Sequence, residues 1–343
     1  MNQTAAFDQS LDLKSLNAIL APYKDPDLRR SLWQVSNTLL PFLCCAVAMY
    51  FTAAFGWWLL YPPLALTGGL LLLRIFCIQH DCGHGSFFKS NWANDLLGGI
   101  LGVMTLTPYR YWRQTHAVHH ATSGSLDRRG WGDIDTRTLA EYRAMSPWRQ
   151  RGYRLYRSWP VMFVFGPVFH FLVYHRFPGI IPSDWKVERL SILKTDFVLA
   201  CLLFAASQTI GVGPYLLVQG TICAVASALG VWLFYVQHQF ENSYWRKDHD
   251  WDFAAASLNG SSFYALPRVL QWFTANIGFH HIHHLNSRIP NYYLERAMKE
   301  NPVFQRVTRL TLLESLKCAK LALWDEKRER MVGFAEAERL SAQ

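Results

Sequence analysis

Two long stretches of the sequence contain no Asp, Glu, Lys or Arg, and they constrain the fold more than any other feature. The first runs from Ser31 to Leu73 and the second from Phe197 to Phe240. Each holds roughly 40 residues, whereas one helix that crosses a membrane needs about 20. Each stretch is therefore predicted to form two membrane-spanning helices joined by a short turn. Glycine or proline marks these turns, at Phe55–Trp58 and Gly211–Pro214.

Composition favours a membrane protein over a soluble one. Hydrophobic residues make up 51% of the chain and charged residues 17%, against about a quarter charged in ordinary soluble domains. The alternative is a pair of buried helices in a soluble protein, but charge-free runs of this length are typical of membrane spans. We predict one all-α membrane domain over residues 1–343, with four helices as two hairpins. The predicted spans are residues 33–54, 57–77, 195–212 and 214–237.

Two shorter apolar segments, residues 95–109 and 158–175, are predicted to lie at the membrane interface without crossing. The first is too short, and Pro160, Gly166 and Pro167 interrupt the second. Basic residues flank both segments, and the excess of Lys and Arg marks the cytoplasmic side of a membrane protein. Residues 78–194 and 238–343 and both termini are therefore expected in the cytoplasm, in a multi-pass protein of a bacterial inner membrane.

The net charge of +9 does not point to nucleic acid, because the basic residues lie next to the predicted spans. The seven cysteines form no Cys-x-x-Cys pair, which disfavours a disulfide framework or a zinc ribbon. The first 30 residues resemble no cleavable signal. The last segment, from Leu312, has helical periodicity and alternating charges, and is predicted to be a solvated helical surface.

Histidine is the residue type whose placement points to chemistry. Eight of the 13 histidines occur at positions three or four apart in three clusters. Residues at these spacings share one face of a helix, so each cluster can present two or three imidazoles together. His281 interrupts the third cluster and is predicted to point about a quarter-turn away. The clustered residues are His80 and His84; His116, His119 and His120; and His280, His283 and His284.

A metal centre explains these clusters better than a structural role. Eight imidazoles held together without a metal would need a partner for every nitrogen, and would repel one another if protonated. As neutral groups they are common metal ligands. Eight ligands are more than one ion can bind, so two ions are predicted. Ligation by nitrogen alone suits Zn, Cu, Fe or Ni. Oxidative chemistry near a membrane argues for iron among these. No Glu-x-x-His motif occurs, which excludes the carboxylate-bridged di-iron bundles.

One further histidine and three acids are candidates near this centre. His238 falls at the end of the fourth predicted span and is a ninth candidate ligand. Asp81, Asp133 and Asp135 could each orient an imidazole through its second nitrogen, and each is about equally well explained as a surface or helix-end acid. His170 and His175 are interpreted as interfacial polar groups and His249 as a loop residue.

The sequence is identified by its motifs as similar to the integral-membrane fatty acid desaturases of the fatty acid hydroxylase–desaturase superfamily. The matching segments are "HDCGHGSFF" (His80–Phe88), "HAVHHATSGSLDR" (His116–Arg128), "QHQFENSYW" (Gln237–Trp245) and "HHIHHLNSRIPNYYL" (His280–Leu294). The short first box resembles that of the acyl-lipid desaturases of plants and cyanobacteria, although many plant enzymes have a histidine where this chain has Gly85. Three boxes in this order around membrane spans make the resemblance highly specific.

The resemblance implies desaturation of a fatty acyl chain at two iron ions, with O2 as oxidant and two electrons per turnover. It implies as ligands the eight clustered histidines and His238, with an acyl lipid or acyl thioester as substrate. The chain has no iron–sulfur cysteine cluster, dinucleotide-binding fingerprint or fused haem motif, so an external ferredoxin or cytochrome b5 is the expected donor. The basic cytoplasmic face would attract an acidic donor or anionic lipid.

Other functions stay open from the motifs alone. Hydroxylation, epoxidation, or oxidation of an alkane or carotenoid would share the first hydrogen abstraction with desaturation. A metal transporter would need ionisable groups inside its spans, and the charge-free stretches disfavour it. The bond position, the chain length and the carrier of the acyl chain are not encoded in the boxes.

Overall fold

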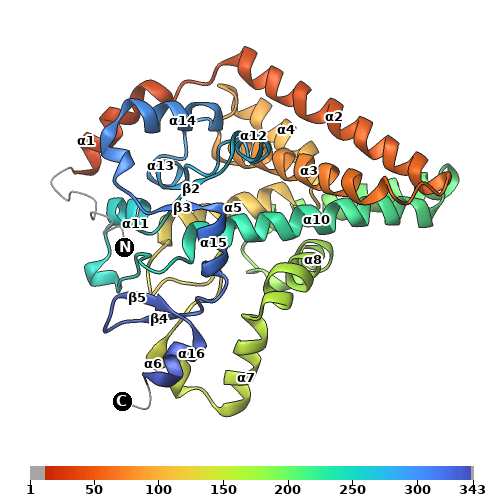
Figure 1. Ribbon diagram of the computed structural model, residues 1–343. Helices are drawn as coiled ribbons and strands as arrows, with labels where there is room; N and C mark the ends of the chain where they lie inside the picture. The colour runs from red at the N-terminus through yellow and green to blue at the C-terminus, as the bar shows by residue number, and fades with distance from the viewer. Residues whose placement is uncertain (1–11, 341–343) are drawn as a thin grey trace.

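The computed structural model describes residues 12–340, and its four longest helices arise from the charge-free stretches (Figure 1). Each is long and apolar enough to cross a membrane. The prediction of a helical membrane fold with four spans is confirmed. The four helices are α2 (Leu28–Ala54), α3 (Tyr61–His84), α9 (Lys186–Gln208) and α10 (Val212–His238).

At the ends away from the turns the helices extend beyond the predicted spans, because a helix continues past the apolar core of the membrane until a residue ends it. At the turns, α3 begins at Tyr61 instead of residue 57 and α9 ends at Gln208 instead of residue 212. The α3 helix reaches His84 instead of residue 77, and ends where Gly85 adopts the left-handed conformation (φ 68°). His80 and His84, predicted to follow the second span, lie in the last two turns of the same helix. The α9 helix begins at Lys186, before the predicted start at residue 195.

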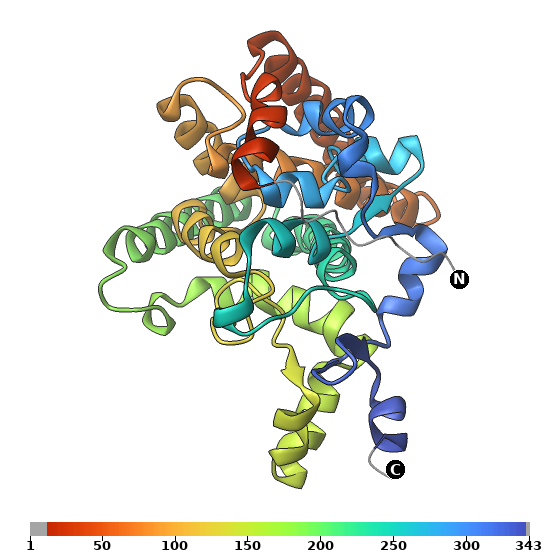
Figure 2. The ribbon, with the colours of Figure 1, turned by 90° about the vertical axis from the view of Figure 1, so that its left-hand side faces the viewer.

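The α3 helix is the centre of the membrane bundle, where it packs against α2, α4 (Asn91–Met104) and α10. Met49, Leu72, Ile75 and Ile222 are each at most 3% exposed and belong to one core. The α10 helix packs chiefly against α3, whereas α9 lies mainly along α5 (Tyr109–Thr122). The second hairpin is therefore more open than the first (Figure 2).

Neither shorter apolar segment forms a helix long enough to cross a membrane. One is α4; the other contains a π-helical turn (Val161–Phe165), α8 (Gly166–Leu172) and the turn η3 (Tyr174–Arg176). Their interfacial placement stays a prediction. His175 is only 3% exposed, and its ring packs against His170 and Tyr111; its interpretation as an interfacial group likewise stays a prediction.

The remaining elements gather at one end of the spans and form a mainly helical cap (Figure 1). Two small sheets join them, one with strand order β1-β4-β5 and one with β2 parallel to β3. The helices are α1 (Leu13–Leu20), α6 (Leu139–Ala144), α7 (Pro147–Tyr156), α11 (Phe253–Asn259), α12 (Arg268–Phe273), α13 (His280–Leu285), α14 (Asn291–Glu300), α15 (Leu312–Cys318) and α16 (Phe334–Arg339). The short 3-10 turns are η1 (Ala21–Tyr23), η4 (Pro178–Ile180), η5 (Asp248–Asp250) and η6 (Pro302–Gln305). The strands are β1 (Arg137–Thr138), β2 (Phe263–Ala265), β3 (Arg309–Thr311), β4 (Leu323–Asp325) and β5 (Arg330–Val332).

The prediction of a solvated helical surface after Leu312 was partly wrong, because β4 and β5 form an antiparallel hairpin between α15 and α16. Trp324 is 1% exposed and packs with Leu126, Trp245 and Met331. Burial of these apolar side chains, together with pairing of β4 with β1, outweighs the helical propensity of the charged residues in the turn.

Candidate metal centre

The last turns of α3 and α10, helix α5 and helix α13 bring nine histidines together at the cap end of the bundle. They form two adjacent groups, and within each group one nitrogen per residue lies within 4.8 Å of all the others. The first group has five members and the second has four. The first is His80, His84, His116, His120 and His283, and the second is His119, His238, His280 and His284.

All nine predicted ligands are members of a group, and their division follows from helix geometry. On α5, His116 and His120 are four residues apart and face the first group, while His119 is turned by about 100° from His120 and faces the second. On α13, His280 and His284 face the second group and His283 the first. His120 and His284 stack at 4.1 Å between ring centroids, at the boundary of the two groups.

The geometry fits metal ions better than a hydrogen-bonded cluster. The Nε2 atoms of His280 and His119 lie 2.9 and 3.2 Å from Nε2 of His238. Nitrogens that bind one divalent ion at about 2.1 Å stand about 3 to 4 Å apart. The buried Nε2 atoms of His84 and His284 have no hydrogen-bond partner in the described chain. A neutral imidazole offers a lone pair there, and an ion would satisfy it.

Five imidazoles of α5 and α13 are held in the neutral, metal-binding form. Burial, and after it the charge of the neighbouring imidazoles, lowers their pKa well below the usual range; this applies to His116, His120, His280, His283 and His284. Because a metal competes with protons for the same lone pair, low basicity leaves these nitrogens free for ions at neutral pH.

Asp133 and Asp135 have different surroundings, which separates their possible roles. The Asp133 carboxylate lies 2.5 Å from Nδ1 of His119. Gly132 adopts φ 77°, and a side chain there would lie 2.8 Å from the Thr115 carbonyl, so glycine allows this loop to approach α5. Asp135 instead pairs with Arg137 at the surface. Of these two acids, Asp133 contacts an imidazole of the centre and Asp135 contacts none.

Asp81 is buried and connects the first histidine cluster to α14. One carboxylate oxygen lies 3.3 Å from Nδ1 of His80, and the other accepts hydrogen bonds from the backbone and side-chain amides of Asn291, at 2.7 and 2.8 Å. Gln34 of α2 in turn donates to Asn291 at 2.9 Å. Asn291 and Gln34 were not singled out in the sequence, although Asn291 belongs to the matching segment that follows the third box.

His281 lies in neither group. Its side chain is fully buried, and Nε2 lies 3.0 Å from the carbonyl oxygen of Phe304. Burial lowers the pKa of His281 to about 3. Its neutral ring is thus a packed part of the cap. His249, by contrast, is exposed beside Asp250, in agreement with its prediction as a loop residue.

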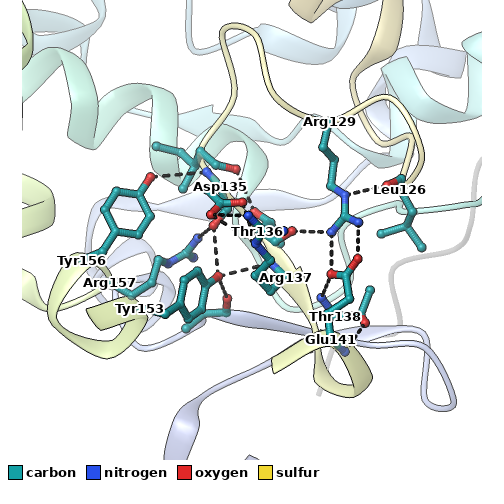
Figure 3. A network of polar contacts seen from close by, with 12 residues as sticks. Leu126, Arg129, Asp135, Thr136, Arg137, Thr138, Glu141, Tyr153, Tyr156 and Arg157 are labelled. Carbon is teal, nitrogen blue, oxygen red and sulfur yellow. Dashed lines mark hydrogen bonds and ion pairs between the residues drawn. The ribbon is translucent and has the colours of Figure 1, made fainter. Parts of the chain in front are cut away.

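Arg157 anchors a polar network behind the centre (Figure 3). This buried guanidinium donates to the Tyr235 hydroxyl and to the Gln239 side chain, each at 2.9 Å, and to the Asp135 carbonyl at 3.1 Å. Gln239 directly follows His238. The network thereby ties the loop of Asp133 to the end of α10, which positions ligands of the second group relative to each other.

We expect Arg157→Met to lower the free energy of unfolding by about 2 to 4 kcal/mol, because several buried acceptors lose their donor at once. The measurement is thermal unfolding of the purified protein in detergent. Arg151→Met on the exposed side of α7 is the matched control and should leave the melting temperature nearly unchanged. Equal effects of the two changes would contradict the anchoring role.

Comparison with known proteins agrees with this site. The family model described as "Fatty acid desaturase" matches residues 24–308. A "Fatty acid desaturase" of Bacillus subtilis is 41% identical over 97% of this chain and 92% of its own length. An "sn-1 acyl-lipid omega-3 desaturase (ferredoxin)" of Synechocystis is 30% identical over 82% of this chain and 77% of its own. An "sn-1 oleoyl-lipid 12-desaturase" of Anabaena variabilis is 29% identical over 78% and 75%.

A helical fold with four possible membrane spans and a cluster of histidines able to hold metal defines a class of membrane proteins with a candidate metal centre, and the family match makes this protein an oxidoreductase of that class. Within that class, this chain belongs to the fatty acid desaturase family.

Proposed function

We propose that the protein introduces a cis double bond into a fatty acyl chain, using O2 and two iron ions held by the nine grouped histidines. The observation that carries this proposal is the pair of adjacent imidazole groups at the ends of two membrane-length helices. The family supports the reaction class. The proposed ligands are His80, His84, His116, His120 and His283 for one ion, and His119, His238, His280 and His284 for the other.

The reaction breaks two C–H bonds on adjacent methylene carbons and forms one C=C bond. O2 takes up four electrons, two from the acyl chain and two from a donor, and with the two hydrogens of the chain and two protons from water it yields two molecules of water. Bound iron would supply the oxidising power that amino-acid side chains lack. The chain itself holds five imidazoles of α5 and α13 neutral, orients His119 through Asp133, and surrounds the centre with buried side chains that exclude water.

The two electrons would come from a separate protein, a ferredoxin or a cytochrome b5. Support comes from relatives whose names include ferredoxin and from the net charge of +9, which favours encounter with an acidic carrier. The substrate would be an acyl lipid or an acyl thioester in the membrane; the acyl-lipid relatives favour the former.

We further propose that the cap and both termini face the cytoplasm of a bacterial cell, with the turns after α2 and α9 on the outside. The support is the distribution of Lys and Arg, which avoid both turns. Single cysteines at the exposed positions Asp127 and Asp184 should resist a membrane-impermeant maleimide in intact cells and react after lysis. The exposed Cys44 and Cys201 are first replaced by alanine. Labelling of either position in intact cells would overturn this orientation.

The reaction is tested by expressing the chain in a host without polyunsaturated lipids and analysing intact lipids by mass spectrometry. A lipid two hydrogens lighter, formed only with O2, is the expected product, and fragmentation locates its double bond. A product heavier by one oxygen would instead identify a hydroxylase or epoxidase. Iron analysis of the purified protein, expected to give two ions per chain, tests the metal separately from the product.

A further inference from the structure

A groove opens on the side of the cap, between α12 and α15, with β2 and β3 as its floor. Apolar side chains line it, and one cation lies among them. Its volume is about 650 Å³, which falls within the range of small-molecule sites. Its principal lining residues are Phe263, Leu266, Pro267, Leu312, Leu313 and Arg309.

The groove lies at the level where the membrane spans meet the cap. The α12 helix packs against α3, and α15 and β2 pack against α10; both views place α12 and α15 beside the cap ends of these spans (Figures 1 and 2). Ser262, next to the groove, donates its N–H to the Gln237 carbonyl in the last turn of α10, at 3.0 Å. The groove therefore opens sideways at the depth expected for lipid headgroups.

The floor of the groove contacts the segment that leads into α13. The Phe263 ring in its floor stacks on the ring of Phe279, with centroids 4.8 Å apart and planes 14° apart. Phe279 directly precedes His280, the first residue of α13. The groove is thus linked through this stack to the helix that carries three of the grouped histidines.

The side chains at the rim of the groove are apolar although they are exposed. Leu313 is 77% exposed and Leu316 58% exposed on α15, and Val269 is 67% exposed on α12. These side chains point away from the core of the protein, beside the ends of the spans. Exposed leucines next to a membrane-spanning helix are typical of surfaces that enter the membrane interface.

The cations of this rim are available for an anion. Arg309 is exposed and makes no hydrogen bond or ion pair with any side chain among residues 12–340, and the exposed Arg268 and Lys317 lie on the two flanking helices. The nearby Glu314 accepts hydrogen bonds from the amide and hydroxyl of Thr311. These bonds, and after them the charges of Arg309 and Lys317, lower the pKa of Glu314, so its carboxylate partly offsets the positive charge of the rim without forming an ion pair with Arg309. The guanidinium of arginine matches the geometry of a phosphate.

We infer that this groove binds a glycerophospholipid from the adjoining leaflet, with its phosphate on Arg309 and its acyl chains against Phe263, Leu312 and Leu313. The apolar side chains of the groove match the acyl chains of such a lipid, and the arginine at its rim matches the phosphate. A free fatty acid lacks the phosphate, and an acyl-CoA carries its phosphates on a long soluble group outside the interface. The inference rests on the proposed function, because the acyl chain of such a lipid would be the substrate of that reaction.

The test uses the iron-loaded protein in phosphatidylcholine nanodiscs with a trace of phosphatidylglycerol that carries a photoactivatable acyl chain. Mass spectrometry should map crosslinks to residues 263–267 and 309–313, and unlabelled phosphatidylglycerol should compete with them. Arg309→Glu should reduce this crosslinking by about tenfold, as expected for loss of a charge-assisted hydrogen bond and introduction of repulsion. Arg306→Glu, an exposed cation outside the groove lining, is the matched control and should change little.

The inference would be overturned if crosslinks spread evenly over the lipid-facing helices, if competition failed in the unmutated protein, or if both arginine variants behaved alike. Stronger groove labelling by a photoactivatable acyl-CoA or free fatty acid would also overturn it. Competition in the unmutated protein keeps the test valid even if Arg309→Glu does not fold. Lipid oxidation without groove labelling would refute the groove alone, whereas groove labelling without any oxidised product would refute the proposed function alone.

Discussion

The His284→Ala protein is expected to lose at least one iron ion per chain and its desaturase activity, whereas the His281→Ala protein should keep both. The two residues lie on the same short helix and are both buried. His284 has a buried Nε2 without a hydrogen-bond partner among residues 12–340 and stacks on His120 where the two groups meet. His281 instead contacts the Phe304 carbonyl. His284 and His281 are both buried, so the expected difference between them comes from their position: His284 belongs to a group of candidate ligands and His281 does not.

The two variants should lose different properties: His284→Ala should lose metal binding, and His281→Ala should lose stability. Loss of an outer residue that orients a ligand typically costs about 10- to 100-fold in metal affinity or activity, so loss of the ligand His284 should cost more than about 100-fold. His281→Ala should lower the free energy of unfolding by about 2 kcal/mol, because it leaves a small cavity and an unpaired carbonyl. Iron per chain, product yield at saturating donor, and melting temperature measure these effects. Retention of both ions by folded His284→Ala protein would contradict its proposed role.

Asp133→Asn should reduce iron affinity and activity by about 10- to 100-fold, the second-largest effect expected outside the groove. The carboxylate, 2.5 Å from Nδ1 of His119, fixes the ring so that Nε2 faces His238 and His280 of the second group. An amide of the same shape is a weaker acceptor and no longer stabilises positive charge on a metal-bound imidazole. The readout is the rate of iron loss to a chelator, followed alongside turnover.

Asp135→Asn provides the matched comparison, two residues along the same loop. Its carboxylate is about half exposed and pairs with Arg137, and exposed pairs of this kind contribute about 0 to 1 kcal/mol to stability. We expect chelator resistance and turnover within about twofold of the unmutated protein. If the two aspartate variants lost iron at the same rate, the effect would belong to the loop as a whole and the orienting role of Asp133 would be rejected.

The membrane helices could be predicted because their signal is local. Burying an unpaired charge in lipid is costly, so the absence of charge over about 40 residues is sufficient to predict two spans. The spacing of the histidines likewise predicts which imidazoles share a helix face. The ends of the helices were less predictable, because α3 ends only where Gly85 permits a left-handed turn, beyond the apolar part of the span.

The hairpin of β4 and β5 could not be predicted from its own residues. Trp324 is buried by Leu126 and Trp245, which lie far away in the sequence, and its pairing partner is β1. Asn291 and Gln34 illustrate the same limit: their contact with each other and with Asp81 joins three helices that are separate in the chain. Packing between residues that are distant in the sequence determines these features. The periodicity of a single segment therefore cannot predict them.

Charge-free stretches and histidine spacing are local features, and they predict four apolar helices and three histidine clusters able to converge on metal. How those imidazoles are divided between two groups was set by the tertiary structure. It placed His119 with His238, apart from its neighbour His120, and it distinguished Asp133 from Asp135. The physical reason is that a helix sets the angle between its own side chains, while the partners they meet are set by how the helices pack.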